Sequence, residues 1–222
     1  MTRTADFNGL ARLYRWMEFF SFGPWLSMTR RTFIGQLAGS RRALVLGDGD
    51  GRFTAMLLRY NRAVSVDAVD ASPAMLQALL RRSGEFSNRV QVHLEDVREW
   101  VVPAPIAAMP YDLIATHFFL DCLTTREVNL LAAKIRLAAS PGALWVVSEF
   151  AIPAGWFGRL VARPVVAGLY FSFRLLTGLE VRTLPDHEAA FCRAGFTLKE
   201  RKSRLAGLLV AELWCAATPI EA

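Results

Sequence analysis

Cysteine, lysine and long uncharged runs are all scarce in this sequence. Among its 222 residues there are three cysteines, Cys122, Cys192 and Cys215, which are odd in number, far apart and without the spacing of metal ligands. They predict free thiols in a reducing compartment rather than a disulfide framework or a zinc site. We expect no signal peptide and a cytoplasmic protein, because Arg12 and Arg15 interrupt the apolar N-terminus.

The scarcity of lysine gives the chain an arginine-rich surface. The net charge is +6, and only three of the 26 basic residues are lysine. A basic surface suits acidic substrates, nucleic acid or anionic lipid, but the arginines are scattered rather than clustered with aromatic residues, which argues against nucleic acid. In the aromatic-rich stretch 151–176, the longest uncharged run covers residues 164–173, about half of the roughly 20 residues that a membrane-spanning helix needs. We therefore expect no transmembrane helix.

The most informative stretch is ALVLGDGDGR, residues 43–52. Four apolar residues predict a short buried strand, three glycines follow at alternate positions, and the apolar spacing of residues 53–60 predicts a helix. A glycine turn between a strand and a helix lets backbone N–H groups approach a ligand closely, because no Cβ stands in the way. The stretch therefore predicts a nucleoside-binding turn.

The spacing of the glycines narrows the class of ligand. Dinucleotide-binding turns have the pattern G-x-G-x-x-G, and Arg52 occupies the place of the third glycine. The observed G-x-G-x-G favours a single nucleoside that carries an amino acid. The next predicted strand, residues 64–69, ends at Asp70, which is placed to accept hydrogen bonds from ribose hydroxyls.

With GDGDG at residues 47–51 and VDASPAML at residues 69–76, the sequence resembles the class I S-adenosylmethionine-dependent methyltransferases. The resemblance implies S-adenosyl-L-methionine as cofactor, S-adenosyl-L-homocysteine as product, and no metal. It also implies that the adenine amino group meets Asp96 and that Val97 packs along the ring. The cofactor-binding residues expected on this resemblance are Gly47, Asp48, Gly49, Asp50, Gly51, Asp70, Ala71, Met75, Asp96, Val97 and Thr116.

One position departs from the family. The acid that often stands two residues before the first glycine is Val45 here. That acid usually helps to hold the methionine part of the cofactor, so either Asp48 or Asp50 replaces it, or cofactor binding is weak. The partner of the cofactor's amino group is left open.

A predicted strand over residues 111–116 delivers His117, Phe118 and Phe119 to its carboxyl end, where ligands of open α/β sheets bind. His117 is the candidate catalytic base, because a neutral imidazole accepts a proton near neutral pH. A histidine that only orients substrate or hydrogen-bonds the chain is the alternative. For the substrate we expect contacts from Tyr14, Phe118, Phe119 and Tyr170, against the alternative that such aromatic residues are ordinary core.

Strands and helices alternate strictly up to about residue 147, which predicts a parallel sheet with helices on both faces. A helix within 184–195 and two strands, 196–201 and 207–217, joined by a short turn, predict an antiparallel pair at the end. Together with the resemblance, the fold expected is α/β and Rossmann-like, with seven strands, mostly parallel, and an antiparallel last strand.

We expect a single methyltransferase domain over residues 1–222. Helices at 7–17 and 24–39 are expected before the first strand of the sheet. The apolar stretch 151–176 predicts either a lid over a lipophilic substrate or a helix packed as core or at an oligomer interface. Weak docking on anionic lipid and a homodimer are further expectations. The expected parts are a helical cap (1–40), the cofactor-binding core (41–149), an apolar lid (150–183) and a C-terminal helix and strand pair (184–222).

The function predicted is methyl transfer to the oxygen or carbon of a small, hydrophobic or aromatic acceptor. Short glycine and proline segments near the C-terminus also resemble the quinone-biosynthesis C-methyltransferases, whereas Thr116 to Phe119 lacks the Asn-Pro-Pro-Tyr motif of the enzymes that methylate DNA adenine or glutamine. The alternatives are a non-catalytic protein that binds cofactor or a partner, and then a nicotinamide-dependent oxidoreductase.

Overall fold

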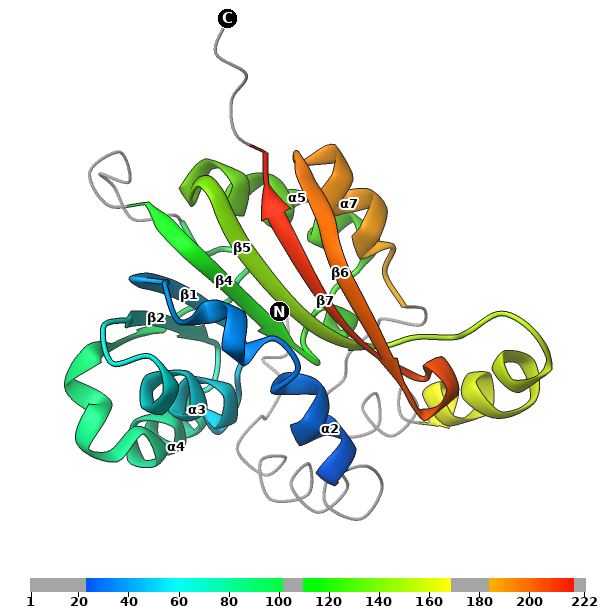
Figure 1. Cartoon of the computed structure of the whole chain (residues 1–222), viewed down its shortest axis with the longest axis horizontal. Helices are drawn as coiled ribbons and strands as arrows, with labels where there is room; N and C mark the ends of the chain where they lie inside the picture. Colours follow the sequence, from blue (N-terminus) through cyan, green and yellow to red (C-terminus); the bar gives the residue numbers. More distant parts are fainter. Residues whose placement is uncertain (1–22, 102–109, 169–183, 218–222) are drawn as a thin grey trace, which may run out of the picture.

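The computed structural model describes residues 23–101, 110–168 and 184–217. A twisted sheet of seven strands in the order β3-β2-β1-β4-β5-β7-β6 forms its centre (Figure 1). The strands are β1 (Arg42–Leu46), β2 (Ser65–Asp70), β3 (Val90–Leu94), β4 (Tyr111–His117), β5 (Ala139–Phe150), β6 (Phe196–Arg204) and β7 (Leu209–Ala216).

The pairing confirms the predicted sheet. Strands β1 to β5 are parallel where they pair, and β7 lies between β5 and β6, antiparallel to both. Pro141 and Gly142 lie inside β5, where the register with β4 shifts between the pairs Tyr111↔Ala139 and Leu113↔Leu144. Because β1, β2, β4 and β5 run in the same direction, their carboxyl ends lie along one edge of the sheet.

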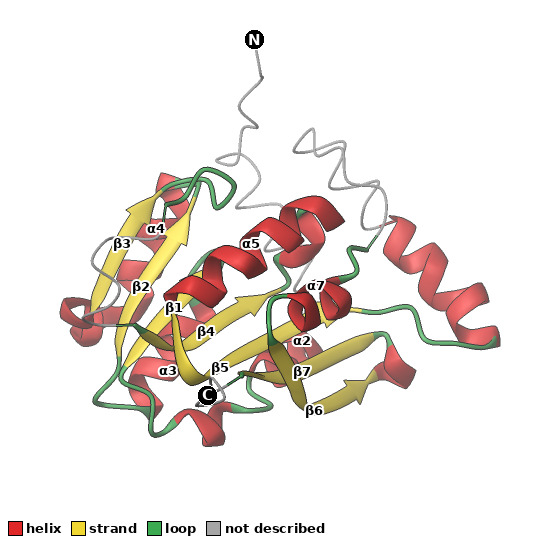
Figure 2. Ribbon diagram, turned by 90° about the horizontal axis from the view of Figure 1, so that it is seen from above, coloured by secondary structure: helices red, strands yellow, loops and turns green. Residues whose placement is uncertain are grey.

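Helices cover both faces of the sheet, as the strand–helix alternation predicts (Figure 2). On one face α3 and α4 pack through Phe53, Leu57 and Leu79. On the other face, α5 and α7 pack through residues that include Leu131 and Phe191. The helices are α2 (Gly23–Arg30), α3 (Arg52–Tyr60), α4 (Pro73–Ser83), α5 (Thr125–Ala138) and α7 (His187–Arg193), with the shorter η1 (Ile34–Leu37), η2 (Gly84–Arg89), η4 (Leu120–Cys122), η5 (Gly158–Ala162) and η6 (Leu205–Gly207).

The second N-terminal helix is shorter than predicted. We expected one helix over residues 24–39, but α2 ends at Arg30 and a turn separates it from η1. The hydroxyls of Thr29 and Thr32 donate to the carbonyls of Trp25 (2.7 Å) and Met28 (3.1 Å). Such side-chain bonds to a carbonyl four residues earlier bend helices and weaken them, which explains the early end. The helix expected over residues 7–17 lies outside the described residues.

The described part of the inserted segment is helical over residues 156–168 and includes a π-helical turn, η5. Ala162 and Val166 pack against Leu208, beside the turn between β6 and β7. Trp156 and Leu160 are each 72% exposed. Whether the rest of the segment forms a lid over substrate stays a prediction, because residues 169–183, Tyr170 among them, lie outside the described part.

Candidate functional site

The glycine turn after β1 is shaped by backbone angles and close packing that only glycine accommodates. Gly47, Gly49 and Gly51 all have positive φ, at 63°, 57° and 80°. A Cβ at Gly47 would fall within the ring of Phe119, and a Cβ at Gly51 would lie 2.6 Å from Cα of Leu79 on α4. The first glycine therefore allows Phe119 to lie against the turn, and the third allows α4 to pack against the start of α3.

Asp48 lies within the glycine turn, and its side chain caps the start of α3. Its Oδ1 accepts from the N–H of Phe53 (3.2 Å) and its Oδ2 accepts from the N–H of Thr54 (2.8 Å). Burial raises the pKa of Asp48, while these bonds and the charge of Arg30 oppose the shift. Backbone N–H groups at a helix start are the donors that hold phosphates in nucleotide sites. Here a carboxylate already uses two of them, so the turn is poorly suited to a pyrophosphate.

Asp50 is held by two arginines at the side of the turn that α4 approaches. Its carboxylate pairs with Arg82 on α4 (2.6 Å) and with Arg52 (3.2 Å), the residue that replaces the third glycine of a dinucleotide turn. Val45, where the family often has an acid, is 1% exposed and belongs to the core. The two acids expected to replace that acid, Asp48 and Asp50, thus both have partners within the protein.

Asp70 ends β2 beside the glycine turn. Its Oδ1 accepts from the N–H of Ser72 (2.8 Å), and Ser72 in turn caps α4 by accepting from the N–H of Met75. Burial raises the pKa of Asp70 to about 6, and the nearby charge of Asp48 adds to the rise. Met75 approaches the turn from the other side, since its Sδ lies 3.9 Å from where a Cβ of Gly49 would stand. The turn and Asp70 therefore form one site, with Ala71 exposed at its margin.

The residues expected around adenine divide into an exposed acid and a buried valine. The N–H of Glu95 donates to the carbonyl of Asp70 (3.2 Å), which joins the ends of β2 and β3. Asp96 follows, accepts from the N–H of Arg98 (2.9 Å) and keeps 39% of its side chain exposed. Val97 is 6% exposed and packs in the core. The structure thus brings Asp96 to the same edge as Asp70.

Thr116 and His117 point to opposite faces of β4. The hydroxyl of Thr116 accepts from the indole N–H of Trp145 (3.0 Å) in the core beneath α5 and α7. His117 lies on the α3 side, where its ring centroid is 4.3 Å from that of Phe53 and its Nδ1 is 2.9 Å from the Ser148 hydroxyl.

His117 is 5% exposed, and its Nε2 has no hydrogen-bond partner within the described part of the chain. Burial, and then the charge of Arg30, lower the pKa of His117 well below its usual value, which favours the neutral form of the imidazole. The contact with Ser148 matches the alternative role, a histidine that hydrogen-bonds the chain. Its role as a base stays a prediction.

Phe118 has φ of 54°, a conformation that costs a non-glycine residue about 1–2 kcal/mol. Its ring lies 4.9 Å from the guanidinium of Arg30 and 5.4 Å from the ring of Phe150. Arg30 is 9% exposed and brings a positive charge from α2 to the end of β4. The strained turn sends Phe118 toward α2 and Phe119 toward Gly47.

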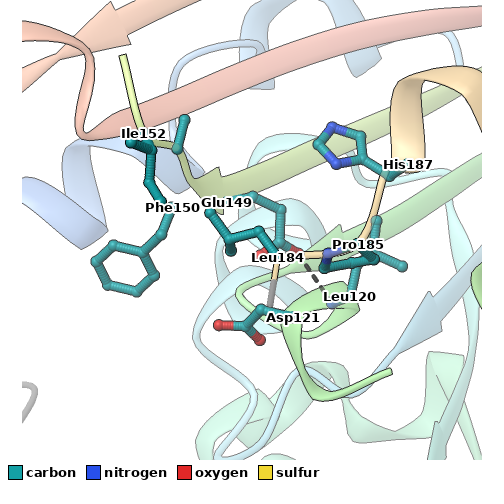
Figure 3. Close-up of a pocket in the computed structure, with 9 residues that line it drawn as sticks. Leu120, Asp121, Glu149, Phe150, Ile152, Leu184, Pro185 and His187 are labelled. Carbon is teal, nitrogen blue, oxygen red and sulfur yellow. Dashed lines mark hydrogen bonds between the residues drawn. The ribbon is translucent and has the colours of Figure 1, made fainter. Parts of the chain in front are cut away.

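A pocket of about 190 Å³ opens beyond the ends of β4 and β5 (Figure 3). Two carboxylic acids contribute to it, Asp121 on η4 and Glu149 in β5. Oε1 of Glu149 accepts from the N–H groups of Phe119 (3.1 Å) and Leu120 (2.9 Å). The other residues that line the pocket are Leu120, Phe150, Ala151, Ile152, Leu184, Pro185 and His187.

Sequence reasoning missed Glu149, Asp121 and Arg30. The signal for Glu149 was available, because it comes at the carboxyl end of an apolar strand as Asp70 does, but the regular alternation was followed only to about residue 147 and β5 continues to Phe150. Tyr14 and Tyr170 lie outside the described residues. Within residues 23–101, 110–168 and 184–217 there is no cluster of potential metal ligands, and no helix there is long and apolar enough to span a membrane.

Comparisons with known proteins bear on the fold and the domain family of this chain. Residues 44–145 match the family model described as a methyltransferase domain. A structure of an O-methyltransferase family protein from Burkholderia thailandensis is similar over 89% of this chain and 57% of its own, with 14% identity and a TM-score of 0.68. The N-methyltransferase NodS from Bradyrhizobium japonicum is similar over 86% and 97%, with 13% identity and a TM-score of 0.57.

The match and the fold confirm the resemblance to class I S-adenosylmethionine-dependent methyltransferases. S-adenosylmethionine is the cofactor of this class, and the glycine turn with Asp70 at the next strand end fits it. The likeness to quinone-biosynthesis enzymes stays a prediction.

The curated relatives that this chain matches are polyamine aminopropyltransferases. Polyamine aminopropyltransferase 2 of Bacillus cereus is 33% identical over 114 residues, which are 46% of this chain and 30% of that protein. The polyamine aminopropyltransferase of Mycobacterium tuberculosis is 30% identical over 145 residues, 59% of this chain and 27% of that protein. The matched region thus spans less than a third of the length of these relatives.

Proposed function

We propose that this protein transfers the methyl group of S-adenosylmethionine to a small acceptor with an apolar body. The observation that carries the proposal is the acidic glycine turn, in which Asp48 occupies the helix-start donors and Asp70 stands at the next strand end. These groups suit a nucleoside with a positively charged sulfonium and ammonium. They disfavour the anionic pyrophosphate of a nicotinamide dinucleotide.

The protein's part in the reaction is to hold and align. When bound, the cofactor supplies an already activated methyl group, so no covalent enzyme intermediate is needed. Asp70 would hold the ribose hydroxyls, and Asp96, whose side chain is 39% exposed, would hold the adenine amino group. Phe118 and Phe119 exclude water and place the acceptor in line with the methyl group, which supplies much of the rate enhancement in such transfers.

A second candidate is aminopropyl transfer to an amine. The curated relatives favour it, because they are polyamine aminopropyltransferases that are 30–33% identical to this chain over 114 to 145 residues. An aminopropyl donor is also a sulfonium nucleoside, so the same turn and the same Asp70 would suit it. The two reactions differ in the carbon that leaves sulfur, and hence in the nucleoside that remains.

The nucleoside product separates these candidates. Purified protein would be incubated with S-adenosylmethionine, or with its decarboxylated form, together with a panel of phenols, quinols and amines. Methyl transfer releases S-adenosylhomocysteine, and aminopropyl transfer releases methylthioadenosine. Acceptor-dependent S-adenosylhomocysteine supports the proposal. Acceptor-dependent methylthioadenosine supports the second candidate, and neither nucleoside, despite cofactor binding, favours a non-catalytic protein.

A further inference from the structure

The helix that follows β5, residues 156–168, is held on the end of the sheet by small buried residues. Gly158 and Ala162 belong to its buried face. Ala162 packs against Leu208, beside the turn between β6 and β7, and a Cβ at Gly158 would collide with the carbonyl oxygen of Pro153. The buried face is therefore filled by contacts within the protein, and no larger side chain of the helix is needed there.

The outer face of this helix is exposed to solvent. It consists of Trp156, Arg159, Leu160 and Arg163, whose spacing of three and four positions brings them to one side of a helix. Trp156 and Leu160 are each 72% exposed. The helix lies at one end of the molecule, past the turn between β6 and β7 (Figures 1 and 2). A large aromatic and a large aliphatic side chain side by side at a projecting end indicate an interaction surface.

The charge of the outer face is positive. The side chains of Arg159 and Arg163 form no ion pair within the part of the chain that the structure describes, and residues 150–168 contain no acidic residue. A helix that carries arginine beside exposed tryptophan and leucine suits the surface of an anionic bilayer. The cations meet the phosphates of the headgroups, and the apolar side chains enter the boundary with the acyl chains. A nucleic acid would satisfy the charges but not the apolar side chains.

The segment that leads into this helix also lines the pocket beyond β4 and β5. Phe150, Ala151 and Ile152 belong to the pocket wall, and Ile152 is 40% exposed (Figure 3). Trp156 follows Ile152 in the chain by four positions. A bilayer that holds the outer face would therefore lie close to the pocket wall.

We propose that the outer face docks on the surface of an anionic lipid bilayer. The inference does not depend on which reaction the protein catalyses. The helix lies in the plane of the interface, with Arg159 and Arg163 at the level of the lipid phosphates and Trp156 and Leu160 directed toward the acyl chains. Because four side chains bury little apolar area and exposed charges are screened by salt, the docking is reversible and weakens as the salt concentration rises.

Co-sedimentation with sucrose-loaded vesicles measures the docking. The vesicles contain phosphatidylcholine alone, or phosphatidylcholine mixed with phosphatidylglycerol, which is anionic. The charge variant combines Arg159→Gln with Arg163→Gln. Its matched control combines Arg59→Gln with Arg62→Gln, which removes two exposed arginines at and just after the end of α3.

A second pair of variants tests the apolar side chains. Trp156→Ser with Leu160→Ser is compared with Leu130→Ser and Leu137→Ser, which replace two exposed leucines on α5. Circular dichroism checks that every variant is folded, and light scattering gives its oligomeric state.

We expect the parent protein to bind the anionic vesicles at least about tenfold more tightly than the neutral ones, because each arginine near an anionic surface contributes about fivefold. The charge variant should bind the anionic vesicles about 10- to 30-fold more weakly, and the apolar variant about 10- to 100-fold more weakly. Both controls should stay within about threefold of the parent, since they leave the outer face intact.

Three results would overturn the inference. The first is equal binding to both kinds of vesicle, or binding to neither. The second is a loss of binding in the outer-face variants no larger than in their controls. The third is a changed oligomeric state of the outer-face variants with unchanged vesicle binding, which would make this face an interface between copies of the chain.

Discussion

Replacing Gly47 by alanine is expected to destabilise the protein more than the same change at Gly49. Both residues have positive φ, at 63° and 57°, so both alanines are strained by the backbone. Only at Gly47 would the added methyl group fall within the ring of Phe119. At Gly49 the nearest atom to that methyl group is Sδ of Met75, at an ordinary contact distance of 3.9 Å.

The structure gives the size of this difference. A left-handed conformation costs an L-residue about 1–2 kcal/mol, and forcing an extra methyl group into packed surroundings costs about 1–3 kcal/mol more. We therefore expect Gly47→Ala to lower the free energy of unfolding by about 2–5 kcal/mol and Gly49→Ala by about 1–2 kcal/mol. For a domain of this size each kcal/mol lowers Tm by about 2–4 °C.

Thermal unfolding followed by circular dichroism measures both variants against the parent protein. Gly84→Ala is the control, because Gly84 also has a positive φ of 57°, but nothing lies within 4 Å of an added Cβ. It should resemble Gly49→Ala. A Gly47→Ala variant as stable as these two would refute the close approach of Phe119 to the turn.

Three further outcomes are expected. His117→Ala should lower turnover, measured by kinetics, far more than it weakens cofactor binding, measured by calorimetry on the same samples. Turnover equal to that of the parent protein would remove His117 from the mechanism. Thr124→Ala should lower the free energy of unfolding by about 1 kcal/mol, because it removes the capping box with Glu127 at the start of α5, and urea unfolding should show no change in the m-value. The pKa of Asp70 is about 6 in the folded protein, against 3.8 as the ordinary value of an aspartate, so the folded protein binds this proton more tightly. The contribution of Asp70 to the free energy of unfolding therefore falls as pH rises from 4 to 6, by about 3 kcal/mol at most. Relative to the parent, Asp70→Asn should therefore gain stability between pH 4 and 6 in urea titrations, and a constant difference would contradict the raised pKa.

The sheet was predictable because its signals are local. The strands β1 and β2 are short, largely apolar runs, the first followed by Gly47 and the second ending at Asp70, and the capping box at Thr124 marks the start of α5. The number of strands and the antiparallel last strand came from the family resemblance, whereas the strand order comes from the structure. The end of α2 was not predictable from apolar spacing, since it depends on hydroxyl bonds of Thr29 and Thr32 to the main chain.

The glycine turn was predicted correctly because a backbone with positive φ favours glycine, so such a turn is visible in the sequence as a group of glycines. The pocket was missed, because it depends on which side of a strand each residue faces. In β5, Ser148 points toward His117 on the α3 side, whereas Glu149 reaches the loop after β4 on the α5 side. Because β5 extends to Phe150, a few residues further than the predicted alternation, Glu149 was not recognised as a strand residue at the carboxyl edge of the sheet.

The most direct test of the central claim is a calorimetric titration with S-adenosylmethionine, S-adenosylhomocysteine and NAD. The acidic turn predicts micromolar binding of both sulfur nucleosides and none of NAD. Asp70→Asn should weaken S-adenosylhomocysteine roughly 10- to 100-fold through the loss of charge-assisted hydrogen bonds, while Glu85→Gln leaves it unchanged. Binding of NAD alone, or of none of the three, would contradict a sulfonium-nucleoside site at Gly47–Gly51.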